Sequence, residues 1–254
     1  VTIDLGITAA QNTGDGNDTL LNFSNLTGSS QDDILKGNNN SNIIKGGNGA
    51  DTIYGIGGSN FLYGESGNDT FIGKVAGSDF IDGGAGSNKV DYSSLSSANS
   101  ITVNLGTTTT FNDENSVSQT VYQIGINGGD SDYVKDIAIF EGSAGNDKFT
   151  VKSGNFELIG GAGNDALYGG NHTTGGVQGT GAADTGKGDT ADYSKASLGL
   201  GVTIDMGRNQ NISDTSTYAV LNDGLGGKDY LNCIENIIGT NYIDNIIGDD
   251  NKNY

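Results

Sequence analysis

Two nine-residue stretches decide the fold of this chain: Gly46-Gly47-Asn48-Gly49-Ala50-Asp51-Thr52-Ile53-Tyr54 and Gly160-Gly161-Ala162-Gly163-Asn164-Asp165-Ala166-Leu167-Tyr168. Both have glycine at positions one, two and four, Asp at position six and an apolar residue at position eight. Glycine adopts backbone conformations that other residues resist, so the first six positions predict a tight turn. The last three predict a short strand with one side chain pointing inward.

Similar nonapeptides run from Gly28 to Asp91, with a ten-residue copy that ends at Asp82, and from Gly142 to Tyr168. One such copy cannot bury an apolar face, but stacked copies share a continuous narrow core, which predicts an all-β solenoid. Position eight is apolar in every copy, as this core requires: Leu35, Ile44, Ile53, Leu62, Phe71, Ile81, Val90, Phe149, Leu158 and Leu167.

A longer period overlies the short one. The segment Val1–Gly6 returns as Ile101–Gly106 and as Val202–Gly207, at spacings of 100 and 101 residues. After each segment, an Asp is followed 15 residues later by a second Asp, as in Asp18 and Asp33, Asp132 and Asp147, and Asp229 and Asp244. This periodicity predicts three units: residues 1–100 with a repeat block at 28–91, residues 101–201 with a block at 142–168 and an insert at 169–188, and residues 202–254 as the start of a truncated third unit.

The charge of the chain points to a cationic partner. Its net charge is −19, from 31 acidic and 12 basic residues, and only five of the acids are Glu. Asp suits tight turns, so these carboxylates are expected there. Such a charge argues against binding to nucleic acid, which requires basic patches, and to anionic membranes. A hard divalent cation with oxygen ligands is the natural counter-charge.

No catalytic constellation is visible, and we expect no enzymatic activity. His172 is the single histidine, whereas a zinc protease motif needs two, and no G-x-S-x-G elbow occurs. The single cysteine, Cys233, forms no disulfide within the chain, and its alignment with Asn22 and Asp136 predicts an exposed, incidental thiol. No apolar run is long enough to span a membrane. Val1–Gly6 does not resemble a signal peptide, which suggests that the chain begins within a longer protein.

The nonapeptides resemble the GGxGxDxUx repeat of RTX (repeats-in-toxin) proteins, over a little under half of the chain. This resemblance implies right-handed parallel β-roll blocks, joined here by β-rich spacers, with two nonapeptides in each coil and Ca²⁺ between the turns. It also implies carboxylate ligands at position six and at the edges of the blocks, completed by turn carbonyls. The predicted carboxylate ligands are Asp33, Asp51, Asp69, Asp79, Asp147, Asp165, Asp18 and Asp244, and the predicted carbonyl ligands are Gly46, Gly47, Asn48, Gly49 and Gly67.

The resemblance extends to function. RTX proteins are exported by type I secretion and fold where calcium is plentiful, and the spacers resemble those of large bacterial adhesins and surface-layer proteins. We therefore expect an extracellular calcium-binding structural module of such a protein. Its expected partners are calcium, neighbouring repeats of the same chain, and like subunits of a surface lattice or cell-surface glycans. The alternative is the accessory repeat region of a secreted enzyme, such as a polysaccharide epimerase or a protease.

Two nonapeptides per coil would place the position-six residues alternately on two flanks of the roll. One flank would carry Asp33, Asp51, Asp69 and Asn88, and the other Asn42, Asn60 and Asp79. We expect calcium on the first flank and between Asp147 and Asp165, an empty step between Asn42 and Asn60, and a weak or empty step between Asn60 and Asp79. Asp214 belongs to no repeat and is expected to take no part.

Overall fold

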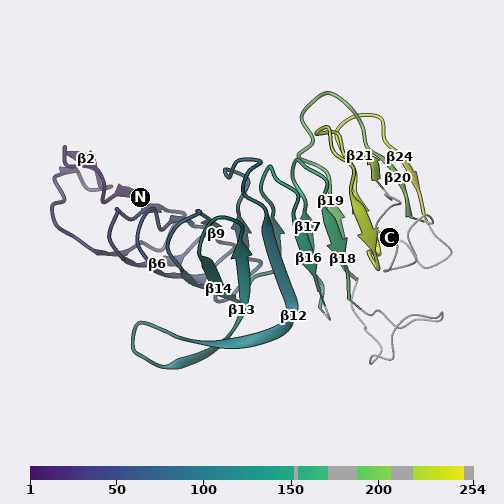
Figure 1. Cartoon of the computed structure of the whole chain (residues 1–254). Helices are drawn as coiled ribbons and strands as arrows, with labels where there is room; N and C mark the ends of the chain where they lie inside the picture. Colours follow the sequence, from purple (N-terminus) through teal and green to yellow (C-terminus); the bar gives the residue numbers. More distant parts are fainter. Residues whose placement is uncertain (152–153, 171–187, 207–219, 249–254) are drawn as a thin grey trace. The chain divides into compact units, whose positions relative to one another are not determined.

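The computed structural model describes residues 1–151, 154–170, 188–206 and 220–248, and the regular elements in these ranges are β-strands (Figure 1). His172, Asp214 and nearly all of the 169–188 insert lie outside them. In the described residues, no helix has the length and hydrophobicity of a membrane span. The chain divides into two compact units, Val1–Tyr92 with Thr108–Ile139 and Ser93–Thr107 with Phe140–Tyr254. The 100-residue units remain a prediction.

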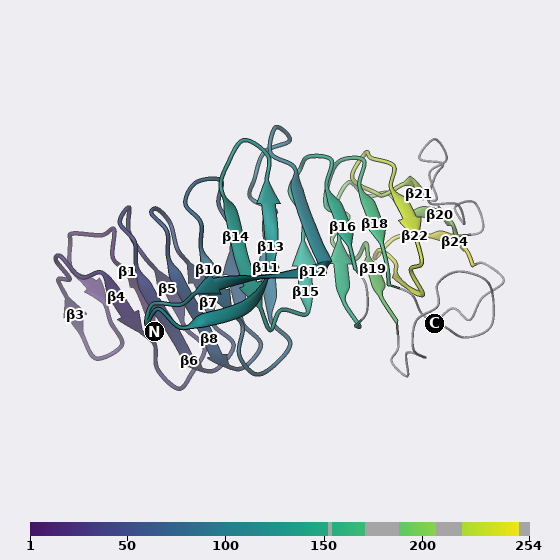
Figure 2. The ribbon, with the colours of Figure 1, turned by 60° about the horizontal axis from the view of Figure 1, so that its bottom comes forward.

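The first unit is a parallel β-roll of two sheets (Figure 2). One sheet contains, in order, β1 (Thr2–Asp4), β5 (Ile34–Lys36), β7 (Thr52–Tyr54), β9 (Thr70–Ile72) and β11 (Lys89–Asp91). The other contains β4 (Asn25–Thr27), β6 (Ile43–Asn48), β8 (Phe61–Ser66), β10 (Phe80–Asp82) and β14 (Ser131–Lys135), followed by the antiparallel β13 (Ser118–Ile126). A small hairpin of β2 (Gln11–Asn12) and β3 (Asn17–Asp18) stands apart from both sheets.

The strand register sets the size of a coil. Ile34 pairs with Thr52, and Ile43 pairs with Phe61, so paired residues are 18 positions apart. Two nonapeptides therefore make one coil, as predicted. The next coil on the second sheet skips a long insertion, because Phe80 pairs with Tyr133. Spacer residues thus continue the roll beyond the nonapeptide block.

The second unit repeats this plan with larger insertions. One sheet contains β15 (Ile139–Glu141), β17 (Glu157–Ile159), β19 (Thr190–Asp192) and β23 (Asn236–Ile238), and the other contains the start of β12 (Ile101–Asn112), β16 (Lys148–Thr150), β18 (Ala166–Tyr168) and β22 (Tyr230–Asn232). Leu167 pairs with Leu231, 64 positions later. A third sheet joins β21 (Val220–Asn222), β20 (Thr203–Asp205) and β24 (Asn245–Ile247).

The core is the stack of position-eight side chains, as predicted. Each of these ten residues is at most 1% exposed. Burying such a side chain stabilises a fold by about 1.5–3 kcal/mol. Position nine faces outward, where the Nζ of Lys36 lies 5.0 Å from the centre of the Tyr54 ring. The stacked nonapeptides therefore share one thin core.

Each of the three segments that open the long period forms a parallel strand pair of the same kind. Ile3 pairs with Leu35, Val103 with Phe149, and Ile204 with Ile246, each in a parallel register. The aligned residues Asn22, Asp136 and Cys233 also share a left-handed backbone, with φ of 62°, 54° and 53°. Cys233 is half-buried rather than exposed. The aligned segments thus share their local strand pairing and backbone conformation.

Candidate metal centre

Position-six side chains form a hydrogen-bonded ladder along each flank of the first unit. Asp51 Oδ1 accepts the backbone N–H of Asp33 at 2.8 Å, and Asp69 Oδ1 accepts that of Asp51 at 2.9 Å. We call the side with Asp33, Asp51, Asp69 and Asn88 the first flank, and the side with Asn42, Asn60, Asp79 and Asp132 the second flank. The predicted alternation of the nonapeptides between two flanks is confirmed.

The other carboxylate oxygen of several ladder residues has no partner. Oδ2 of Asp51, Asp69, Asp165 and Asp223 is buried and accepts no hydrogen bond. A buried carboxylate oxygen without a donor or a cation costs free energy, because nothing replaces the water it loses. These oxygens therefore favour a ligand with positive charge.

Glycine leaves space beside the Oδ2 atoms of other ladder carboxylates as well, including Asp33 and Asp147, whose Oδ2 atoms accept the N–H of Ser29 and Ser143. A Cβ built on Gly28 would lie 2.5 Å from Asp33 Oδ2 and 2.2 Å from the carbonyl oxygen of Gly46. A Cβ built on Gly142 would lie 2.3 Å from Asp147 Oδ2 and 2.2 Å from a carbonyl oxygen of the next coil. A carboxylate and a carbonyl oxygen thus face the same space, and calcium prefers ligands of this kind. The residues present fit calcium.

The predicted carbonyl ligands lie in the turns next to the first flank. Gly47, Gly49 and Gly67 have φ of 111°, 117° and 139°, which glycine adopts without strain. A Cβ on Gly67 would lie 1.8 Å from the carbonyl oxygen of Gly49, so successive turns stack closely. Asn48, at the end of β6, is exposed. In the described residues, no group of three or more His, Cys, Asp or Glu side chains is placed to hold a metal, so carbonyl oxygens would have to supply much of any coordination shell.

Burial makes several of the ladder carboxylates hard to ionise without a cation. It raises the pKa of Asp51 to about 6, and the charges of Asp69 and Asp33 contribute. Burial, together with the charge of Asp229, raises the pKa of Asp165 to about 9. A bound divalent cation would reverse this effect.

The second unit carries a similar ladder. The backbone N–H of Asp147 donates to Asp165 Oδ1 at 2.8 Å, and that of Asp165 donates to Asp229 Oδ1 at 3.0 Å. Asp244 accepts the N–H of Val202 at 2.9 Å and is half-buried. The ladder role of Asp229, like that of Asp132 in the first unit, was missed by the sequence prediction, although the 15-residue Asp spacing signals both.

Asp223 was also missed, because it lies outside any nonapeptide. It is fully buried, its Oδ1 accepts the N–H of Gly227 at 2.8 Å, and its Oδ2 has no partner. A Cβ on Gly227 would lie 2.5 Å from Asp223 Oδ2 and 1.6 Å from the carbonyl oxygen of Gly163. This arrangement repeats the one around Gly28.

Two predicted ligands have different surroundings. Asp18 is exposed in the β2–β3 hairpin and accepts a hydrogen bond from Thr13, so it does not join the ladder. Asp79 joins the second flank, where its Oδ2 contacts Lys74 Nζ at 2.5 Å. Asp79 is followed on this flank by Asp132, so the second flank carries two carboxylates beside its two amides. The long insertion before Asp132 concealed this neighbour.

Comparison with known families agrees with this geometry. The model of the RTX calcium-binding nonapeptide repeat matches in four copies, at residues 27–61, 46–74, 76–94 and 141–171. This chain carries RTX calcium-binding repeats. RTX nonapeptides bind calcium, and proteins that contain them are typically secreted. No curated protein matches the chain.

Proposed function

We propose that this chain is an extracellular structural module of a secreted, repetitive bacterial adhesin or surface-layer protein, and that it folds on binding calcium. The buried, unpartnered oxygens of Asp51, Asp69 and Asp165 carry the proposal. They lie between coils of the roll, so a cation bound there joins one coil to the next. Its role is to stabilise an architecture, and no catalytic role is assigned to the chain.

The proposed ion positions follow from the ladder and the open spaces beside glycines. Calcium occupies the steps from Asp33 to Asp51, from Asp51 to Asp69 and from Asp147 to Asp165. Asp223 adds a ligand outside the repeats, near Asp165, whose pKa is raised in part by the charge of Asp223. The step from Asn42 to Asn60 stays empty, because two amides bring no charge.

A crystal structure in millimolar calcium tests these positions. Anomalous scattering should show ions at the three Asp–Asp steps named above and beside Asp223. It should show none between Asn42 and Asn60. Equal occupancy on both flanks of the first unit would show that turn carbonyls alone suffice to bind calcium, which would contradict the charge argument.

The proposed partners are neighbouring repeats of the same chain and like subunits or glycans at the cell surface. Antibodies raised against the chain should label intact source cells, and electron microscopy should show a surface layer or fibre that disappears on chelation. The alternative, an accessory region of a secreted epimerase or protease, predicts instead that the antibodies follow a soluble enzyme in the medium.

A further inference from the structure

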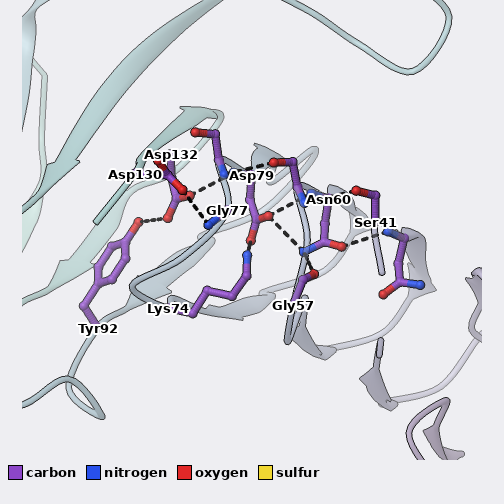
Figure 3. A network of polar contacts seen from close by, with 12 residues as sticks. Ser41, Gly57, Asn60, Lys74, Gly77, Asp79, Tyr92, Asp130 and Asp132 are labelled. Carbon is purple, nitrogen blue, oxygen red and sulfur yellow. Dashed lines mark hydrogen bonds and ion pairs between the residues drawn. The ribbon is translucent and has the colours of Figure 1, made fainter. Parts of the chain in front are cut away.

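The second flank of the first unit contains a lysine, whereas on the first flank the Oδ2 atoms of Asp51 and Asp69 are buried without a partner. Lys74 lies in the ten-residue copy between β9 and β10, and its Nζ is 2.5 Å from Asp79 Oδ2 (Figure 3). The two side chains are 15% and 3% exposed. An ion pair this well buried is screened little by solvent.

Each carboxylate oxygen of this cluster has a partner. Asp79 Oδ1 accepts the backbone N–H of Asn60 at 2.8 Å and its side-chain amide at 2.9 Å. Asp132 Oδ1 accepts the N–H of Asp79 at 2.9 Å, and Asp132 Oδ2 accepts the hydroxyl of Tyr92 at 2.6 Å. By contrast, Oδ2 of Asp51 on the first flank has none.

The ammonium group lies beside the turn at Gly77, on the same side as Asp79 Oδ2. A Cβ on Gly77 would lie 3.4 Å from Lys74 Nζ and 1.8 Å from the carbonyl oxygen of Gly58. The matching first-flank position is Gly67, whose Cβ would lie 1.8 Å from a carbonyl oxygen. In this copy, lysine follows the first glycine and one residue is added to the turn.

We propose that Lys74 supplies to the second flank the positive charge that calcium supplies to the first, so that Asp79 and Asp132 bind no metal. The contrast with the first flank rests on the proposed function, but the absence of metal at Asp79 is tested separately. The carboxylates at this position of the second flank are then neutralised by a cation of the chain itself, whatever the calcium concentration.

The second unit offers a natural comparison. There Asp229 accepts the N–H of Asp165 and the hydroxyl of Tyr193, both at 3.0 Å, as Asp132 accepts those of Asp79 and Tyr92. Asp165 Oδ2, however, remains without a partner among the described residues. The two Asp–Asp–Tyr arrangements thus differ in one respect: Lys74 contacts Asp79 Oδ2 in the first unit, and no described lysine contacts Asp165 Oδ2 in the second.

A double-mutant cycle of Lys74→Met and Asp79→Asn in saturating calcium tests the proposal. Each single change leaves a buried charge alone and should lower Tm by roughly 10 °C. The double variant should recover most of this loss, because it leaves a neutral pair. Lys45→Met is the control: the Lys45 side chain is 38% exposed and its Nζ lies 3.8 Å from Glu114, so its loss should change Tm much less.

Calcium stoichiometry, measured by equilibrium dialysis, separates this proposal from the proposed function. The double variant should bind as many ions as the unchanged chain. A loss of one ion would show that Asp79 is a calcium ligand, and additive Tm losses would show that Lys74 and Asp79 do not act as a pair. Either result would overturn the proposal, even if the chain folds on calcium as proposed.

Discussion

Asp69 uses its two carboxylate oxygens in different ways. Oδ1 accepts the backbone N–H of Asp51 at 2.9 Å, and Oδ2 is buried without a partner. An Asn at this position keeps the first contact and removes the charge. One oxygen of Asp69 therefore belongs to the ladder and the other to the proposed metal site, so a substitution can change the second without the first.

Asp69→Asn should change stability with opposite signs in the two metal states. In calcium, it should lower the free energy of unfolding by about 2–3 kcal/mol, because a charged ligand is lost. Without calcium, it should raise Tm, because a buried charge is removed. Thermal denaturation in both states measures this. The exposed Asp15→Asn is the control; equal effects of both changes would mean that only bulk charge matters.

Cys233 has a left-handed backbone, with φ of 53°, where the aligned residues are Asn22 and Asp136. Asn and Asp tolerate this conformation better than other residues with a Cβ. Cys233→Asn should therefore stabilise the fold by about 0.5 kcal/mol and raise Tm by roughly 1–2 °C. A lower Tm in calorimetry would show that the thiol makes contacts that matter more than the backbone preference.

At the scale of elements, the nonapeptide pattern predicted what is local. The strand after each turn and the inward position-eight residue follow from spacing, because strand and turn are set by neighbouring residues. The 18-residue coil was expected only from the resemblance to RTX repeats, and the strand register confirms it. The pairings that skip insertions, such as Phe80 with Tyr133, were not predicted. They depend on which distant strand completes the sheet, and the spacing within a repeat does not encode this choice.

The ladders also predict a pH dependence. Without calcium, burial raises the pKa of Asp51 and Asp147 from 3.8 to about 6, and that of Asp165 to about 9. Because the folded pKa exceeds the unfolded one, the metal-free fold is most stable near the unfolded pKa and below. It loses stability as the pH rises through the folded values. Calcium binds the deprotonated form, so its stabilising effect should shrink in acid.

Thermal denaturation in calcium-free buffer from pH 4 to pH 9 measures this dependence. Tm should fall as the pH rises, and Asp165→Asn should flatten the part of the curve above pH 6. If Asp165→Asn does not change how far Tm falls with pH, the pH dependence comes from the net charge of −19 and not from this carboxylate.

At the scale of the whole molecule, negative charge opposes the stacking of coils. Position-six carboxylates one coil apart, about 4.8 Å, repel by roughly 3–4 kcal/mol per pair at an effective dielectric constant near 20. A cation that binds only the folded chain reverses this effect and couples binding to folding. Lys74 supplies a positive charge to Asp79 at one place. Calcium is proposed to supply positive charge along the first flank and in the second unit.

Circular dichroism with calorimetry, in millimolar calcium and in excess chelator, tests this account most directly. The account predicts that the chelator removes β-structure, at least between Gly28 and Asp91, and lowers Tm, and that added calcium restores both. A spectrum and a Tm that are the same with and without calcium would contradict it.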